Sequence, residues 1–119
     1  MSNPPLLEIV LLCRNREAMA ENCIKAILPQ LNPSVHFWIS DNSTSYQPYS
    51  FLVNHPHKIT IVRRGGHLSQ FAHMSIVFKE ISASYAVLMH DDDMFSPYFV
   101  SMMLDFVDKY PFYGVLLNK

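Results

Sequence analysis

The amino-acid sequence predicts a single α/β domain with a mostly parallel sheet and helices on both of its faces. Two observations support this fold class. Strand-like and helix-like patterns alternate along the chain, as is typical of parallel strands joined by helices. The first four strand-like stretches are each followed directly by a polar cluster, at residues 14–16, 41–43, 63–66 and 90–93. Because ligands bind beyond the carboxyl ends of parallel strands, these clusters predict one site at one edge of the sheet.

Length and composition fit one domain and exclude several classes of protein. The chain has 119 residues, of which 50% are hydrophobic and 16% charged, so general disorder is excluded. A net charge of −1 gives no electrostatic basis for binding nucleic acid. No stretch approaches the roughly 18 apolar residues of a transmembrane helix, and two cysteines cannot form a disulfide framework. We therefore expect one cytoplasmic domain over residues 1–119, with no nucleic-acid partner.

The first half of the chain predicts a strand, a helix and a second strand. Residues 6–13 form a nearly continuous apolar run, which is typical of a strand covered on both faces. Residues 17–28 carry apolar side chains at helical spacing, and Pro29 is expected to end this helix. Residues 35–40 are rich in β-branched and aromatic side chains, which favour a second strand.

The second half of the chain continues the alternation. Residues 58–62, 85–89 and 113–117 predict three more strands, and residues 68–81 and 97–110 predict two helices. The apolar face of the helix over residues 68–81 is expected to consist of Phe71, Met74, Val77, Phe78 and Ile81.

The strongest functional signal is the run Asp91-Asp92-Asp93, directly after the fourth strand. Adjacent carboxylates repel, by roughly 3 kcal/mol per pair at about 5 Å with an effective dielectric constant near 20, so we expect a bound cation. Oxygen ligands without cysteine favour Mg²⁺ or Mn²⁺. The structural alternative is that the acids stabilise the N-terminus of a helix that starts at Pro97. Strand pleating would pair Asp91 with Asp93 on one face.

Three segments in order, EIVLLCRNR, WISDNST and YAVLMHDDDMFSP, resemble the family 2 glycosyltransferases of the GT-A fold. Those enzymes place an Asp at the end of the second strand and an acidic DxD-type metal motif after the fourth. The resemblance covers nearly all of residues 7–118. It implies a Rossmann-like fold and inverting transfer from a nucleotide-diphosphate sugar, often a UDP-sugar, as in polysaccharide biosynthesis. The acceptor would be a saccharide or a lipid-linked molecule, which fits a place at the inner membrane surface.

The resemblance also implies roles for individual residues. Asp41 matches the Asp that pairs with the uracil ring imide, with an Asx-turn as the alternative interpretation. Asp92 stands where the principal metal ligand usually stands. Asp91 or Asp93 would then complete the metal shell or contact the ribose. The cofactor would be Mn²⁺ or Mg²⁺.

Basic and amide side chains at the strand ends complete the expected nucleotide site. Arg63 and Arg64 are candidates for the diphosphate, because guanidinium groups match phosphate oxygens. The alternative is that they are solvated strand-end charges. Arg14 and Asn15, at the exit of the first strand, are expected to contribute to the same site.

Two further expectations concern what the chain does as a whole. The helix over residues 97–110 has only a narrow polar stripe, which predicts self-association through it; the alternative is a monomer with this helix under the sheet. No acidic residue follows Asp108, so the general base is expected outside this chain, which would be incomplete relative to a full glycosyltransferase.

A non-catalytic nucleotide-sugar-binding module is the alternative function. A nucleotidyltransferase is disfavoured because residues 11–17 contain no glycine.

Overall fold

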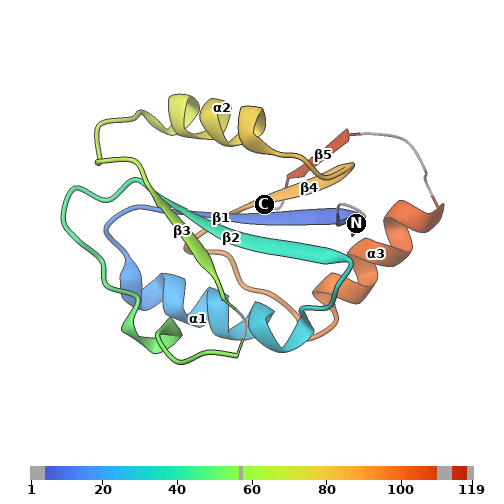
Figure 1. Cartoon of the computed structure of the whole chain (residues 1–119). Coiled ribbons are helices and arrows are strands. Elements are labelled where there is room, and N and C mark those ends of the chain that lie inside the picture. The colour runs from blue at the N-terminus through green and yellow to red at the C-terminus, as the bar shows by residue number, and fades with distance from the viewer. Residues whose placement is uncertain (1–4, 57, 110–113, 118–119) are drawn as a thin grey trace.

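The fold is built on one five-stranded parallel sheet in the part of the chain that the computed structural model describes, residues 5–56, 58–109 and 114–117. The strand order is β3-β2-β1-β4-β5, and each neighbouring pair is parallel (Figure 1). The strands are β1 (Leu7–Cys13), β2 (Val35–Asp41), β3 (Thr60–Arg63), β4 (Tyr85–His90) and β5 (Gly114–Leu117). This sheet confirms the predicted α/β class.

Helices cover both faces of the sheet. They are α1 (Glu17–Ile27), α2 (Gln70–Glu80) and α3 (Phe99–Lys109), with short 3₁₀ helices at Leu28–Gln30 and Ser50–Leu52. In Figure 1, α2 lies on one side of the sheet, and α1 and α3 lie on the other. The buried side chains form two clusters that match this arrangement, one shared by the sheet with α1 and α3 and one shared with α2.

The position of β1 at the centre of the sheet explains why its sequence is apolar at every residue except Glu8. All seven of its residues are buried. Leu7, Ile9 and Leu11 belong to the cluster on the α1 side, whereas Val10 and Leu12 belong to the cluster on the α2 side. Because successive side chains of a strand point to opposite faces, a strand with a helix layer on each side needs apolar residues at both parities.

The observed ends of the helices and strands lie within two residues of the predicted ends. Helix α1 ends at Ile27, and Pro29 lies in the 3₁₀ helix that follows, in agreement with the helix-ending role expected for it. Strands β2 and β4 each continue one residue further than predicted, to Asp41 and His90. Tyr110 and Tyr113, which the sequence assigns to the last helix and the last strand, lie outside the described residues.

The predicted apolar face of α2 is wrong in part. Phe71 is 81% exposed and Phe78 is also exposed, whereas His73 and Val77 are the buried residues of this helix. Met74 and Ile81 pack at the side of the α2 cluster, as partly buried residues. The helix is therefore turned so that a histidine, rather than Phe71, faces the sheet. This rotation of α2 is stabilised by a hydrogen bond between His73 and Ser40 of β2.

A buried carboxylate joins the strands near the amino edge of the sheet. Glu8 is only 2% exposed, and its carboxylate accepts a hydrogen bond from the Trp38 indole nitrogen at 2.6 Å. It also accepts from the backbone amides of Ser82 at 3.1 Å and Ala83 at 3.2 Å. These bonds tie β1 to β2 and to the segment that enters β4.

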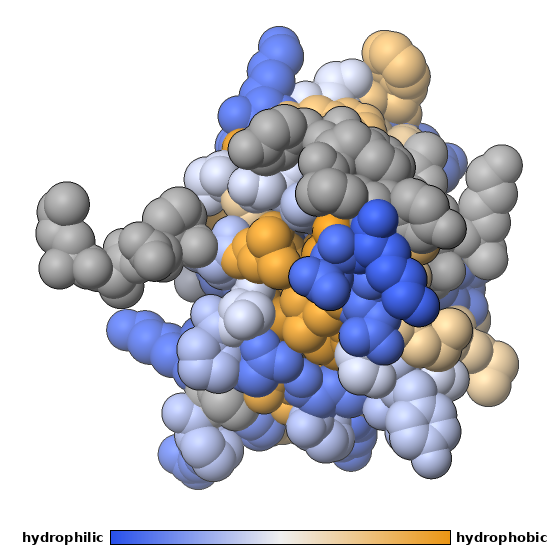
Figure 2. All heavy atoms as spheres, turned by 90° about the vertical axis from the view of Figure 1, so that its right-hand side faces the viewer, coloured by the Kyte–Doolittle hydropathy of each residue, from blue (hydrophilic) through white to orange (hydrophobic). Residues whose placement is uncertain are grey.

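Helix α3 packs against the sheet along one side and is exposed along the other. Val100 and Val107 are buried in the α1-side cluster, while Tyr98, just before the helix, and Met102 within it are exposed. The face of the molecule on the right-hand side of Figure 1, where α3 lies, carries hydrophobic atoms in its middle, with polar side chains around them (Figure 2). Helix α3 therefore packs under the sheet, as the alternative interpretation of this helix expects.

None of the described helices is long and apolar enough to span a membrane.

Candidate functional site

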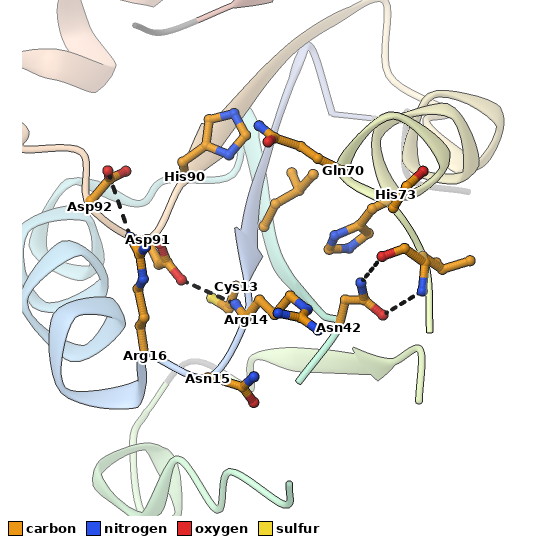
Figure 3. Close-up of a pocket in the computed structure, with 13 residues that line it drawn as sticks. Cys13, Arg14, Asn15, Arg16, Asn42, Gln70, His73, His90, Asp91 and Asp92 are labelled. Carbon is orange, nitrogen blue, oxygen red and sulfur yellow. Dashed lines mark hydrogen bonds and ion pairs between the residues drawn. The ribbon is translucent and has the colours of Figure 1, made fainter. Parts of the chain in front are cut away.

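A pocket of about 770 Å³ opens at the carboxyl edge of the sheet, where the sequence predicts a site. Its wall comes from the ends of β1 and β4, the turn after β2 and the start of α2 (Figure 3). The lining residues are Leu12, Cys13, Arg14, Asn15, Arg16, Asn42, Leu68, Ser69, Gln70, His73, His90, Asp91 and Asp92. Arg14, Asn15, Asp91 and Asp92 are therefore the predicted site residues that the fold brings together.

Asn15 fixes the exit of β1 against the turn that follows β2. Its backbone has a φ of 55°, a left-handed conformation that asparagine tolerates better than most residues. The backbone amide of Asn15 donates a hydrogen bond to the Ser43 hydroxyl at 2.8 Å, and its side-chain oxygen accepts one from the Thr44 backbone amide at 2.9 Å. Gly66 packs closely against the same turn, since a Cβ there would lie 2.7 Å from the Thr44 Cα. The turn after β2 is thus held in place by the hydrogen bonds of Asn15 and by the close packing of Gly66.

The acidic run forms a turn in which two carboxylates face the pocket and one does not. Asp91 is buried, and its carboxylate accepts a hydrogen bond from the Arg14 amide at 3.1 Å. Asp92 lies at the exposed rim. Asp93 turns back instead, and its carboxylate accepts from the His90 amide at 2.8 Å. The pleating argument that paired Asp91 with Asp93 is wrong, because β4 ends at His90 and the acids occupy the turn beyond it.

One guanidinium group lies near both pocket carboxylates. Arg16 Nη1 is 3.7 Å from Asp91 Oδ1 and 3.8 Å from Asp92 Oδ2. Burial raises the pKa of Asp91, and the Arg14 amide and the Arg16 charge act in the opposite direction. The buried carboxylate is therefore held at the pocket by the Arg14 amide and by the partly exposed Arg16 guanidinium.

The Cys23 thiol of α1 contacts the backbone of the acidic turn, a role that the sequence did not indicate. Its sulfur lies 2.8 Å from the Asp93 carbonyl oxygen and 3.1 Å from that of Asp91. Burial raises the pKa of this thiol to about 11, so it keeps its proton and can donate it to these carbonyls. In the sequence, Cys23 was only one apolar position of an amphipathic helix.

Asp41 lies outside the pocket lining and is only 2% exposed. One carboxylate oxygen accepts from the Ser43 amide at 2.8 Å, which is the bond that the Asx-turn interpretation requires. The other lies 3.4 Å from an Arg63 guanidinium nitrogen. Arg63 also donates to the Gln47 carbonyl and stacks over the Tyr46 ring, 4.4 Å from its centroid. The contact of Asp41 with uracil stays a prediction.

Arg64 is not among the residues that line the pocket, but it is connected through Ser40 to His73, which does line it. Its guanidinium donates to both carboxylate oxygens of Glu80, at 2.7 and 2.8 Å, and lowers the pKa of that acid. Its Nε donates to the Ser40 hydroxyl at 3.0 Å, and this hydroxyl lies 2.7 Å from His73 Nε2. Burial, helped by Arg64, lowers the pKa of His73 to about 4. A neutral imidazole therefore lines the pocket, whereas Arg64, a predicted diphosphate ligand, does not.

The model of the family described as glycosyl transferase family 2 matches residues 8–118. The chain belongs to glycosyl transferase family 2. Comparison with curated proteins found no match. Membership confirms the resemblance drawn from the three sequence segments, and the parallel sheet agrees with the family's α/β Rossmann-like GT-A fold. It makes sugar transfer, with binding of a nucleotide sugar and an acceptor, the general activity of this glycosyltransferase domain.

The oxygen ligands at the pocket of this glycosyltransferase fit a cation that is shared with a substrate. Within residues 5–56, 58–109 and 114–117, no three His, Cys, Asp or Glu side chains gather closely enough to hold a metal ion. Asp91 and Asp92 nevertheless bring two carboxylates to one rim. Mg²⁺ is usually bound by one or two carboxylates together with water and phosphate oxygens, rather than by a closed protein cage. The ligands present match that open arrangement.

Proposed function

We propose that this glycosyltransferase domain binds a UDP-sugar in the 770 Å³ pocket, together with Mn²⁺ or Mg²⁺, and transfers the sugar with inversion. The observation that carries the proposal is the convergence of Asp91, Asp92 and Arg16 on one rim of this pocket. Such a position, beyond the carboxyl ends of parallel strands, is where α/β sheets bind their ligands.

The metal would be held by Asp91 and Asp92, and would supply positive charge to the diphosphate as it leaves the sugar. The chain's own residues prepare that place. The Arg14 amide orients the Asp91 carboxylate, and the Cys23 thiol holds the turn that carries both acids. Without a metal ion, a diphosphate at this rim would meet two carboxylates whose charge the single Arg16 guanidinium offsets only in part.

The nucleoside would lie toward α2 and the turn after β2. Gln70 and Ser69 supply polar side chains on the α2 wall, and His73 supplies a neutral ring. A contact between Asp41 and uracil requires that Arg63 release one carboxylate oxygen, because Arg63 lies 3.4 Å from it. Preference for uridine over other bases is therefore coupled to movement of the Arg63 side chain.

The acidic turn provides a matched pair of variants to test the proposal. UDP binding with Mn²⁺ is measured by calorimetry for the unmodified chain and for Asp92→Asn and Asp93→Asn. Asp92→Asn is expected to weaken binding by about 10–100-fold, because it removes charge from a carboxylate that faces the pocket. Asp93→Asn removes the same charge one residue away and keeps an acceptor for the His90 amide, so its effect is expected to stay within about threefold.

Two outcomes would contradict the proposal. If UDP binds equally well in EDTA, the metal is not part of the site. If GDP and ADP bind as tightly as UDP, the donor is not specifically a UDP-sugar. Release of UDP from UDP-sugars, measured with and without saccharide acceptors, then separates transfer from binding alone. The acceptor, the cytoplasmic location and self-association through α3 stay predictions from the sequence.

A further inference from the structure

Arg16 occupies a position that a bound cation would also favour. It precedes α1 as the residue at its N-cap, and its side chain makes no capping hydrogen bond there. The side chain extends instead toward the acidic turn, as Figure 3 shows, and Nη1 lies 3.7 Å from Asp91 and 3.8 Å from Asp92. The same nitrogen thus lies near both carboxylates that the proposed function assigns to the metal.

These distances describe attraction between charges rather than fixed hydrogen bonds. Charge-assisted N–H···O bonds are usually about 2.7–2.9 Å long. The Arg16 side chain is also 53% exposed, so water can solvate the guanidinium if it moves. Displacing it would therefore cost little in hydrogen bonds, while leaving Asp91 and Asp92 without a nearby cation would restore their mutual repulsion.

We propose that Arg16 is the internal counter-cation of the metal-free site, and that a divalent cation has to displace it. The proposal rests on the proposed function, because it concerns the same two carboxylates. Arg16 and the metal compete for the same oxygens, so each weakens the binding of the other. Arg16 also lines the pocket, so a diphosphate bound there gives the displaced guanidinium a new partner. Metal binding and nucleotide binding thereby become interdependent, and metal alone binds weakly.

The decisive measurement is binding of Mn²⁺ without nucleotide, by electron paramagnetic resonance of the free ion at low ionic strength. Arg16→Gln removes the competing charge and is expected to bind Mn²⁺ about 3–10-fold more tightly than the unmodified chain. Arg16→Lys keeps a cation and is expected to stay within about twofold. Lys25→Gln removes the same charge from the exposed side of α1, where Lys25 pairs with Glu21 outside the pocket lining, and serves as the control for a general electrostatic effect; a change below about twofold is expected.

A second readout tests the interdependence. UDP is expected to tighten Mn²⁺ binding less in Arg16→Gln than in the unmodified chain, because the displaced guanidinium is missing. The melting temperature of Arg16→Gln in EDTA reports whether the variant folds, and Mn²⁺ is expected to raise it more than in the unmodified chain.

The outcomes separate the two proposals. Arg16 is not a counter-cation if Arg16→Gln binds Mn²⁺ no more tightly than the unmodified chain, or if Lys25→Gln has an equal effect. Absence of Mn²⁺ binding in every variant without UDP also overturns it, even if Mn²⁺ binds when UDP is present. Absence of Mn²⁺ binding in every variant with and without UDP overturns the proposed function itself.

Discussion

Two buried carboxylates near opposite edges of the sheet have very different surroundings. Glu8, near the amino edge, accepts three hydrogen bonds of 2.6 to 3.2 Å, from the Trp38 indole and from the Ser82 and Ala83 amides. Asp91, at the carboxyl edge, accepts one from the Arg14 amide and has a guanidinium 3.7 Å away. Both are almost inaccessible to solvent, at 2% and 7% exposure.

The difference distinguishes a structural acid from an acid available to a ligand. A buried charged group is tolerated when its hydrogen-bonding capacity is used, and Glu8 meets that condition with the buried Trp38 indole and two part-buried backbone amides. Asp91 meets it only in part, and its remaining partner is an exposed side chain that can move. We therefore expect Glu8 to govern stability and Asp91 to govern binding.

The largest effect is expected when the donors around Glu8 lose their acceptor. Glu8→Ala leaves the Trp38 indole unpaired in the interior and two part-buried backbone amides without their acceptor, so unfolding should become easier by about 3–5 kcal/mol. Glu8→Gln keeps one acceptor oxygen and should cost about half of this. Asp91→Asn should change stability by less than about 1 kcal/mol. Chemical denaturation of the three variants measures this, and a Glu8→Ala chain as stable as the unmodified one would remove the distinction.

His73 sharpens the comparison, because it lines the pocket yet is satisfied from the interior by Ser40. Its pKa is lowered to about 4 from an ordinary value of 6.5 by burial and by Arg64. Between these values the unfolded chain binds more protons than the folded one, so stability rises with pH across this window and is lost as pH falls from 6.5 to 4. At about 1.4 kcal/mol per pKa unit, the loss is up to about 3 kcal/mol.

Replacing the imidazole isolates its share of that pH dependence. His73→Gln keeps a polar group but cannot be protonated, so its free energy of unfolding should change less between pH 6.5 and 4 than that of the unmodified chain. Denaturation at several pH values measures the difference. Identical pH profiles would mean that other groups cause the acid sensitivity.

The smallest effect is expected at Cys23, which supports the acidic turn without facing the pocket. Cys23→Ala removes the donor to the Asp91 and Asp93 carbonyls, and should weaken Mn²⁺-dependent UDP binding by about 3–5-fold, equivalent to about 1 kcal/mol. Cys23→Ser keeps a donor and should stay within about twofold. If the alanine variant binds as well as the serine variant, the thiol does not position the turn.

Local patterns were sufficient to predict the strands and the edge of the sheet that carries the pocket. The apolar run of β1 and the polar residues after β2 and β4 are readable without tertiary contacts. The rotation of α2 was not, because burial of His73 depends on Ser40, 33 positions earlier in the chain. The pairing of Arg64 with Glu80 is also non-local, since Glu80 lies 16 positions further along the chain. The inward turn of Asp93 is local, but three identical side chains give no signal of which one folds back.

The hydrogen bonds that Asn15 makes with the turn after β2 differ from those of the sheet in how readily they break. The amide of Thr44 is bonded to the exposed side chain of Asn15, whereas the amides of β1 lie between two strands and under two helix layers. Hydrogen exchange at Thr44 therefore requires only local opening, while exchange in β1 requires nearly complete unfolding. The turn after β2 can thus open locally while the sheet stays intact, so motion of this wall of the pocket is decoupled from unfolding of the sheet.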